Sequence, residues 1–364
     1  MLYHITKDYK YDYKYGFANA QGEIVVEPIY SSVGSFSEDR CVVVKPGKPR
    51  EPRSRCKGYI DSTGEIVIPL KNIAYCSDFS EGLAPYDDDW EKDKVGFIDR
   101  WGEIIIEPQF EIDYEGEGAS GFHEGVAAVA IPDGCIYIDT EGKRLFDGTV
   151  FEIARRFSNG YALVQHFSKT PGESEELFLI DKNGNRLETI PCGFRTLSIG
   201  FREGLCEVYL RGLNKNEQDR ISFIDTTGSF AFEGRFADSS GFHEGLCTVR
   251  KAGTKYGVIN TKGEWVIEPK YGSIGLFSNG IAPFAEEEEK YGLINNRGEI
   301  ILPPRFYKIN NFTPNVSRTT IYQNSEPQEL TIATIFEEST KKPPKDVYIN
   351  RAGEIVMPYD ISDN

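Results

Sequence analysis

A short phrase of apolar and polar residues recurs from one end of the chain to the other. It consists of two or three apolar residues, an Asp or Asn, two variable residues and a Gly, as in residues 58–64 and 96–102. Successive copies lie about 40 residues apart, a period typical of repeat proteins. Each copy keeps the Asp or Asn and the Gly, with the former at Asn19, Asp61, Asp99, Asp139, Asp181, Asp225, Asn260, Asn295 and Asn350.

The chemistry of this phrase predicts a tight turn between two strands. An Asp or Asn side chain can accept a hydrogen bond from the backbone two residues on, and Gly reaches the positive φ that closes a loop. Apolar runs such as residues 104–106 follow the turn, so each copy predicts a β-hairpin. Because Pro lacks a donor N–H, we expect it to end the second strand. The Pro residues concerned are Pro28, Pro69, Pro108, Pro269, Pro303 and Pro358.

A second phrase alternates with the first and leads into another apolar run. It reads Phe, a polar residue, Glu or Asn, and Gly, as in residues 79–82. We expect the Phe to be buried in the core and the Gly to allow a turn into the next strand. The phrase begins at Phe79, Phe122, Phe157, Phe201, Phe242 and Phe277, with weaker versions at Phe36 and Phe312.

Three or more strands in each unit of about 40 residues, without a helical period, predict an all-β repeat protein. A β-propeller of about eight blades fits these strands, with an open superhelical stack of β-repeats as the alternative. One extra hairpin, at residues 12–28, does not decide between them. We treat residues 1–364 as a single repeat domain with units at approximately 12–56, 57–93, 94–133, 134–176, 177–219, 220–254, 255–289 and 290–345, and a terminal hairpin at 346–360.

The two phrases together resemble the WG-repeat (KWG-repeat) family. The resemblance is best at residues 256–260, 268–271 and 277–282, and nearly as good at 94–99 and 108–110. It covers essentially residues 12 to 360, more weakly at 134–250 and 305–345. The resemblance implies a β-repeat scaffold, mainly bacterial and usually without an assigned activity, and it transfers no catalytic residue.

Composition narrows the classes of function. The formal net charge is −16, which repels DNA, RNA and anionic membranes and does not favour a nucleic-acid partner. The seven Cys form no C-x-x-C pair, so neither a zinc site nor a disulfide framework is indicated. The start of the chain has no apolar leader, and no apolar run approaches a membrane span. We therefore expect an acidic cytoplasmic protein that does not contact membranes.

Two sets of side chains resemble metal ligands, and the repeat explains both. His123 and His243 occupy the same place in two copies of the second phrase, where other copies have Ser or Arg, so we interpret it as a turn position. Asp181, Asn183 and Asn185 alternate like the start of a calcium loop, but the Gly falls too early and the copy fits the hairpin turn. With no recognisable catalytic motif either, we expect no enzyme activity, no cofactor and no metal.

The copies disagree most in the connections that follow the Phe-led strands. One connection is basic, one is acidic with a Trp, one is a run of Glu, and the longest region lies at about 313–345. If the repeats stack regularly, these connections emerge on one rim, as binding surfaces of repeat proteins often do. The candidate binding residues are Lys48, Arg50, Arg53, Arg55, Asp87, Asp88, Trp90, Glu286, Glu287, Lys341 and Lys342.

From these features we predict a non-enzymatic scaffold that binds a protein partner through the variable connections, as one subunit of a larger bacterial complex. Trp90 among acidic residues favours protein recognition, because Trp often anchors interfaces. Two alternatives are a propeller that binds a small molecule or carbohydrate, and a hydrolase or lyase with carboxylates gathered from several repeats. The sequence names neither the partner nor the oligomeric state.

Overall fold

The computed structural model describes most of the chain. The described residues are 2–8, 13–47, 55–71, 73–87, 94–111, 121–166, 177–189, 194–196, 201–210, 218–287, 290–312, 330–335 and 345–358. Within them the only helix is a single 3-10 turn, η2 (Phe146–Gly148). The expectation of an all-β repeat protein is therefore confirmed.

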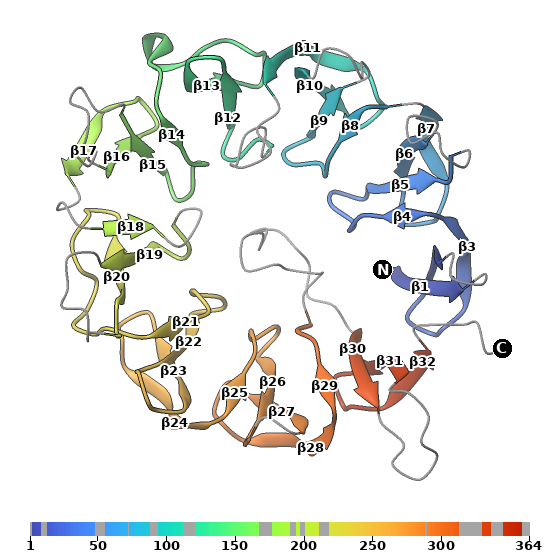
Figure 1. The fold of residues 1–364 in the computed structure, drawn as a ribbon, viewed down its shortest axis with the longest axis vertical. Helices are drawn as coiled ribbons and strands as arrows, with labels where there is room; N and C mark the ends of the chain where they lie inside the picture. The colour runs from blue at the N-terminus through green and yellow to red at the C-terminus, as the bar shows by residue number, and fades with distance from the viewer. Residues whose placement is uncertain are drawn as a thin grey trace.

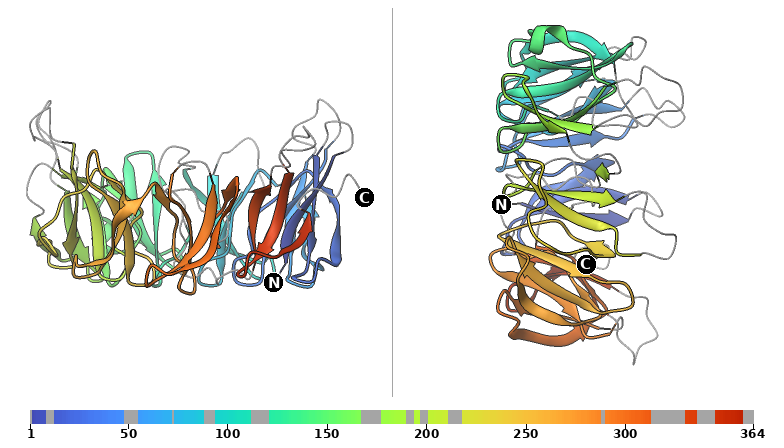
Figure 2. Two further views of the ribbon diagram at one scale, coloured as in Figure 1. Left: turned by 90° about the horizontal axis from the view of Figure 1, so that it is seen from below. Right: turned by 90° about the vertical axis from the view of Figure 1, so that its left-hand side faces the viewer.

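The strands form a ring of successive antiparallel sheet units, which is the architecture of a β-propeller (Figure 1). In a complete unit the chain runs outward through an inner, a second, a third and an outer strand, and the outer strands lie on the outside of the ring. Figure 2 shows that the strands cross the ring between its two rims.

The units follow one another around the ring in chain order, and their strands have these bounds. Units 1 to 3 are β1 (Tyr3–Asp8), β2 (Tyr13–Ala18), β3 (Ile24–Tyr30); β4 (Ser32–Val33), β5 (Cys41–Lys45), β6 (Cys56–Ile60), β7 (Ile66–Lys71); and β8 (Tyr75–Cys76), β9 (Leu83–Asp87), β10 (Lys94–Asp99), β11 (Ile104–Glu111). Units 4 to 6 are β12 (Val126–Ile131), β13 (Gly134–Asp139); β14 (Ile153–Ala154), β15 (Tyr161–Gln165), β16 (Leu177–Asp181), β17 (Arg186–Thr189); and β18 (Phe194–Thr196), β19 (Leu205–Leu210), β20 (Ile221–Asp225). Units 7 to 9 are β21 (Asp238–Ser239), β22 (Leu246–Arg250), β23 (Tyr256–Asn260), β24 (Trp265–Tyr271); β25 (Ser273–Ile274), β26 (Ile281–Ala285), β27 (Tyr291–Asn295), β28 (Ile300–Phe306); and β29 (Lys308–Ile309), β30 (Leu330–Ile335), β31 (Lys345–Asn350), β32 (Ile355–Pro358).

The expected number of about eight blades is slightly off. The strands form eight hydrogen-bonded sheets, but the six-stranded sheet contains two successive units, β8–β11 and β12–β13. Among the described residues, the pair Glu111 and Ala130 is the only strand pairing between these two units. The described strands therefore make nine units. The hairpin that seemed left over at the start is the hairpin of unit 1.

The ring is closed, so the open-stack alternative is wrong. Unit 1 packs against unit 9 in one apolar cluster that contains Tyr3, Ile5, Tyr348 and Met357. The Tyr348 hydroxyl donates a hydrogen bond of 2.8 Å to the carbonyl of His4, although the two residues lie at opposite ends of the sequence. Over the described residues, the first and last strands belong to separate sheets, so side chains close the ring and none of these strands is exchanged.

Contacts between neighbouring units explain two features of the phrases. The turn Gly lies against an apolar side chain on the outer strand of the preceding unit; a methyl group built on Gly102 would lie 3.0 Å from Ile68. Gly22 faces Met357 in the same way at the ring closure. In four copies the Phe of the second phrase packs edge-on against an aromatic ring of the preceding unit, as Phe79 does on Tyr59. The Phe residues at 79, 122, 157, 201, 242, 277 and 312 are buried, as expected.

The predicted role of Pro as a strand end is wrong in five of six copies. Outer strand β11 continues past Pro108 to Glu111, and the pairs Val95–Phe110 and Phe97–Ile106 leave three residues of β11 opposite Gly96. This bulge on an edge strand needs no N–H from the Pro. It also brings the two backbones together, since a methyl group on Gly96 would lie 2.2 Å from the Ile106 carbonyl oxygen. The third-strand Gly is therefore required for the close approach of the outer strand. The other interior prolines are Pro28, Pro69, Pro269 and Pro303.

Candidate functional site

The connections between second and third strands lie on one rim of the ring, because equivalent strands run in the same direction in every unit. Their lengths differ widely. Two residues (132–133) join β12 to β13, five (286–290) join β26 to β27, and eleven (166–176) join β15 to β16. We call this the variable rim. The turns on the opposite rim, which we call the latch rim, keep nearly constant lengths except between β29 and β30, where 20 residues (310–329) join the strands. Residues 313–329 of the long region predicted for the variable rim therefore belong to the latch rim, and only its later part, 336–344, joins a second strand to a third strand.

The structure describes four of the predicted binding residues. Glu286 and Glu287 are exposed directly after β26, where Glu287 forms an ion pair of 2.6 Å with Lys255. Arg55 is exposed just before β6. The predicted place of Asp87 in an exposed loop is wrong, because it is the last residue of β9, its side chain is buried, and its carbonyl accepts a hydrogen bond of 2.9 Å from the Ala74 N–H. The remaining candidates, Lys48, Arg50, Arg53, Asp88, Trp90, Lys341 and Lys342, lie outside the described residues.

The first phrase forms the hairpin turns of the latch rim, as predicted. Asp61 Oδ1 accepts hydrogen bonds from the backbone N–H of Thr63 at 2.9 Å and of Glu65 at 3.0 Å. The Thr63 hydroxyl also donates a hydrogen bond to this carboxylate. This hydrogen bond is the main reason that the pKa of Asp61 is lowered. Gly64 has a φ of +88°, the left-handed region that favours Gly. Residues 181–185 form the same turn, so the turn interpretation of Asp181, Asn183 and Asn185 is confirmed.

The second phrase does more than turn the chain, and the sequence reasoning missed this. Its Glu reaches the same turn of the next unit and accepts hydrogen bonds from two backbone N–H groups. Glu38 binds the N–H groups of Glu81 at 2.6 Å and Gly82 at 2.9 Å. Glu81 in turn binds Glu124 and Gly125 in the next unit. We call this contact the glutamate latch.

Over the described residues of units 2 to 8, the latch recurs with two interruptions. Glu124 binds Gly160 at 2.9 Å, and Glu244 binds Asn279 at 2.6 Å and Gly280 at 2.9 Å. Glu203 binds Gly245 at 2.8 Å. Asn159 and Asn279 occupy the Glu position in units 5 and 8, and their shorter side chains end the series there. The sequence signal was present as Glu repeated roughly every 43 residues, but its partner lies one whole unit away.

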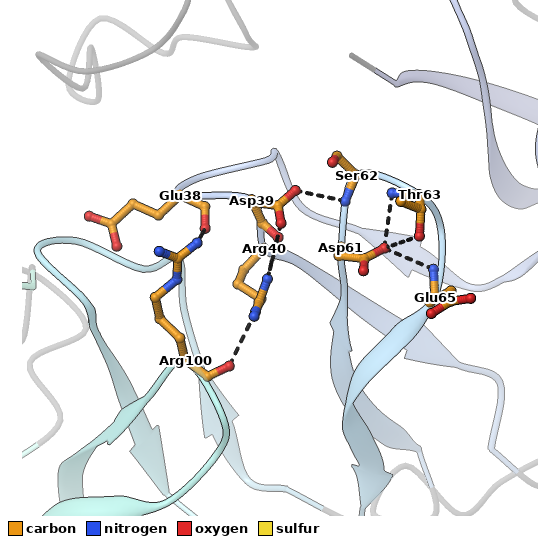
Figure 3. A network of polar contacts seen from close by, with 8 residues as sticks. All are labelled: Glu38, Asp39, Arg40, Asp61, Ser62, Thr63, Glu65 and Arg100. Atoms are coloured by element: carbon orange, nitrogen blue, oxygen red, sulfur yellow. Dashed lines mark hydrogen bonds and ion pairs between the residues drawn. The ribbon is translucent and has the colours of Figure 1, made fainter.

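Further polar contacts join neighbouring units on the latch rim (Figure 3). The Arg100 guanidinium donates to the carbonyl of Glu38, and Arg40 Nε donates to the carbonyl of Arg100 at 3.2 Å. The Ser37 hydroxyl donates to the carbonyl of Phe79 in the next unit at 2.6 Å, and Ser80 does the same to Phe122. His123 and His243 hold the same turn position as these Ser residues, each in a bridge within its own turn, which confirms the turn interpretation.

Buried titratable groups gather around the carbonyl of Gly34, on the inner side of units 1 to 3. His4 Nε2 lies 2.9 Å from this oxygen, and the Cys41 thiol donates to it at 3.1 Å. A methyl group on Gly34 would lie 3.5 Å from Asp78 Oδ1. Burial raises the pKa of Asp78 to about 6 and lowers the pKa of His4. Throughout the described residues, no three His, Cys, Asp or Glu side chains are grouped so that they could hold a metal ion.

The closed ring of antiparallel sheets and its repeated turns define a repeat β-propeller. A family model described as WG containing repeat matches residues 15–48, 58–87, 96–131, 137–166, 221–254, 256–288 and 291–318, which is more than half of the chain. The chain belongs to the WG-repeat family. No curated protein matches it.

Similar solved structures indicate the fold alone. A structure titled "Crystal structure of the eukaryotic initiation factor" has a TM-score of 0.57 at 8% identity, over 98% of this chain and 94% of that chain. The β-propeller domain of the Trilobed protease from Pyrococcus furiosus has a TM-score of 0.38 at 12% identity, over 98% of this chain and 94% of that chain. BamB from Moraxella catarrhalis has a TM-score of 0.43 at 11% identity, over 84% and 93%. Among the described residues, none of the helical structure is long and apolar enough to cross a membrane.

Proposed function

We propose that this protein is a non-enzymatic scaffold that binds a protein partner through its variable rim. The observation that carries the proposal is the contrast between the rims. On the latch rim, backbone N–H groups and Glu carboxylates are used in contacts between units, as in Glu38 with Glu81 and Gly82. On the variable rim, connections change in length from two to eleven residues without altering the strands that they join.

This division fits the way repeat proteins build binding surfaces. A rigid set of strands holds loops in place, and loops tolerate changes of length and charge that a packed interface does not. The described part of the variable rim exposes both signs of charge, with Glu286 and Glu287 after β26 and Arg55 before β6. Exposed charges on such a rim steer association and select partners more than they add affinity.

The proposal is tested with two variants of the variable rim. In one, residues 46–55 are replaced by the Pro-Asp pair that joins β12 to β13. In the other, Glu286 and Glu287 are both replaced by Lys. A partner is first captured from an extract of the native host and purified, and its affinity for each variant is then measured by calorimetry. We expect at least one variant to weaken binding by about tenfold or more.

A matched control changes the same charge on the other rim. Glu103 and Glu141 are exposed in latch-rim turns, and E103K/E141K makes the same change in net charge as E286K/E287K. This control should bind like the wild type, and all variants should keep the wild-type melting temperature. Equal weakening by the control, or the absence of any stoichiometric partner in the extract, would overturn the proposal.

A further inference from the structure

The outer strands of units 1 to 3 begin with exposed apolar side chains. Ile24, Ile66 and Ile104 are the first residues of β3, β7 and β11, and they are 46%, 51% and 42% exposed. Trp101, in the hairpin turn before β11, is 75% exposed. Because β3, β7 and β11 follow one another on the outside of the ring, these side chains belong to three neighbouring units (Figure 1).

The hairpin turns join these side chains into one row. The turn of unit 2 packs on β3, because a methyl group on Gly64 would lie 3.4 Å from Cγ1 of Val25. The turn of unit 3 packs on β7, because a methyl group on Gly102 would lie 3.0 Å from Ile68. Single exposed apolar residues are ordinary, but neighbouring ones mark a contact surface. We call this set the outer apolar row, made of Ile24, Val25, Ile66, Trp101, Ile104 and Ile105.

The fold does not require apolar side chains at these positions. In each unit, the first residue of the outer strand pairs with the residue that precedes the turn Asp or Asn, as Ile66 and Ile104 do. Arg186 makes this pairing in unit 5, and Arg144 makes the equivalent bridge in unit 4. Both Arg residues are exposed. A charged side chain therefore supports the same strand pairing, so strand formation does not explain the row.

Acidic side chains flank the row. A Glu directly precedes each of the three outer strands, and a second Glu follows in β3 and in β11. All five are exposed, namely Glu23, Glu27, Glu65, Glu103 and Glu107. The only basic residue in these three strands is Lys71, at the end of β7. A partner that covers the row therefore needs positive charge beside its apolar residues.

The other units lack this combination or only extend it. Unit 9 adds the exposed Ile355 beside unit 1. Units 7 and 8 also have exposed apolar residues after the turn, but their outer strands expose the basic residues Lys270 and Arg305. The acidic and apolar surface is therefore centred on units 1 to 3.

The backbone of the outer strands favours a helix as the occupant. Pro28, Pro69 and Pro108 lie within these strands, and each strand has an irregular register with its neighbour. An added strand would therefore meet an interrupted edge. The row also crosses three strands, whereas an added strand would follow one. A helix satisfies its own backbone hydrogen bonds and needs only side-chain contacts.

A second copy of this chain does not fit the row. Its described residues contain no α-helix. Its own row would also place Glu against Glu, and like charges across an interface are unfavourable.

We propose that the outer apolar row docks an amphipathic helix of a partner protein. The helix has apolar residues at i, i+3, i+4 and i+7, with Lys or Arg beside this stripe. Trp101 is the anchor of the contact, because an exposed Trp is a frequent centre of binding energy. The helix lies across β3, β7 and β11 on the outside of the ring, close to the latch rim. This surface is separate from the variable rim, and the inference does not depend on the proposed function.

The test uses a synthetic helical peptide of about 18 residues, or five turns, made of Leu and Lys and labelled with a fluorophore. Its Leu residues form one stripe. One control peptide has the same composition with the Leu residues spread around the helix, and a second has Glu in place of Lys. Binding to the full chain is measured by fluorescence polarisation. We expect the striped Leu-Lys peptide to bind, the spread peptide to bind at least about tenfold more weakly, and the Glu peptide not to bind.

Variants that keep the net charge locate the site. I66Q/I104Q should weaken binding of the striped peptide about tenfold, and W101A should weaken it about fivefold or more. The matched control is I300Q/I301Q in unit 8, which removes two exposed Ile side chains next to a strand that contains Arg305. This control should bind the peptide like the wild type, and melting curves check that each variant is folded.

Four outcomes would overturn the inference. They are no binding of the striped peptide, equal binding of the spread peptide, unchanged affinity in both I66Q/I104Q and W101A, and equal weakening by I300Q/I301Q. Because W101A changes a side chain in an exposed turn, it tests the site even if I66Q/I104Q does not fold.

Discussion

The contact between units 2 and 3, inside the ring, and the contact between units 9 and 1, where the ring closes, are stabilised in different ways. Between units 2 and 3 the glutamate latch, the Ser37 hydroxyl and Arg100 add polar contacts to the packing of Phe79 on Tyr59. Between units 9 and 1 the aromatic pair, the contact of Gly22 with Met357 and the Tyr348 hydroxyl recur, but the described residues of unit 1 include no Phe phrase whose turn could receive a latch. Apolar packing against the turn Gly is therefore enough to join two units, and the latch strengthens the internal joints.

A large effect on stability is expected from breaking one latch. In E38Q the amide keeps the shape of the side chain but loses one acceptor for the N–H groups of Glu81 and Gly82. Because hydrogen bonds to charged groups contribute about 1.5–3 kcal/mol, we expect a loss of about 2 kcal/mol in the free energy of unfolding. Urea denaturation measures it. E141Q, at an exposed position on the same rim, is the control, and equal stability of E38Q and E141Q would show that the latch contributes nothing.

A buried carboxyl at the same internal contact should make stability depend on pH. The pKa of Asp78 is about 6 in the folded protein, above its ordinary value of 3.8, so the folded state binds this proton more tightly than the unfolded state. Its contribution is fully present below pH 3.8 and is lost as the pH rises through 6. D78N should therefore exceed the wild type by about 3 kcal/mol at pH 8 and by almost nothing at pH 3.8. A difference that does not change with pH would contradict the assignment.

Replacing a turn Gly by Ala at these contacts should destabilise the protein more where the neighbouring side chain lies closer. A methyl group on Gly102 would lie 3.0 Å from Ile68, and one on Gly22 would lie 3.3 Å from Cβ of Met357. Gly125 also has a positive φ but has nothing within 4 Å. Melting curves should show G102A as the least stable, at a cost of about 2 kcal/mol, with G22A between it and G125A, which costs about 1 kcal/mol for the backbone alone. Equal costs at all three positions would show that neighbours do not matter.

The smallest effect tests whether the two Tyr hydroxyls are equivalent. Tyr59 donates to Ser77 between internal units, and Tyr348 donates to His4 at the ring closure. We expect Y59F and Y348F each to lower the free energy of unfolding by about 1 kcal/mol, the usual value for a single neutral hydrogen bond. Chemical denaturation of both variants in parallel measures this, and a cost confined to Y59F would mean that the terminal bond is not formed in solution.

Local features of the repeat could be predicted from the sequence because their causes are local. The Asp61 turn needs only the backbone within four residues, and the burial of Phe79 follows from its apolar side chain and its place before a strand. The bulge at Pro108 could not be predicted, because it depends on which strand is outermost. Asp87 was misplaced because the strand continues to it before the connection begins.

Long-range features of the ring could not be predicted from the sequence, for a different reason. The number of units that closes a ring depends on small angles between neighbouring sheets, and no residue pattern states them. The bond of Glu38 to Gly82 joins residues in consecutive units, and the hydroxyl of Tyr348 meets His4 only because the ring closes. The variable rim was predicted from disagreement among copies, and most of its candidate residues still lie outside the described part of the chain.

The closure by packed side chains, without a shared strand, has a consequence for how such chains can change in evolution. Each four-stranded unit is a contiguous stretch of sequence that carries both of its contact surfaces. An in-frame duplication of about 40 codons would therefore insert a complete sheet, with its own turn Gly and its own apolar outer strand, and would not divide any existing sheet. Gene duplication could in this way enlarge the ring one whole sheet at a time, and recombination could exchange a single connection while every strand stays in place.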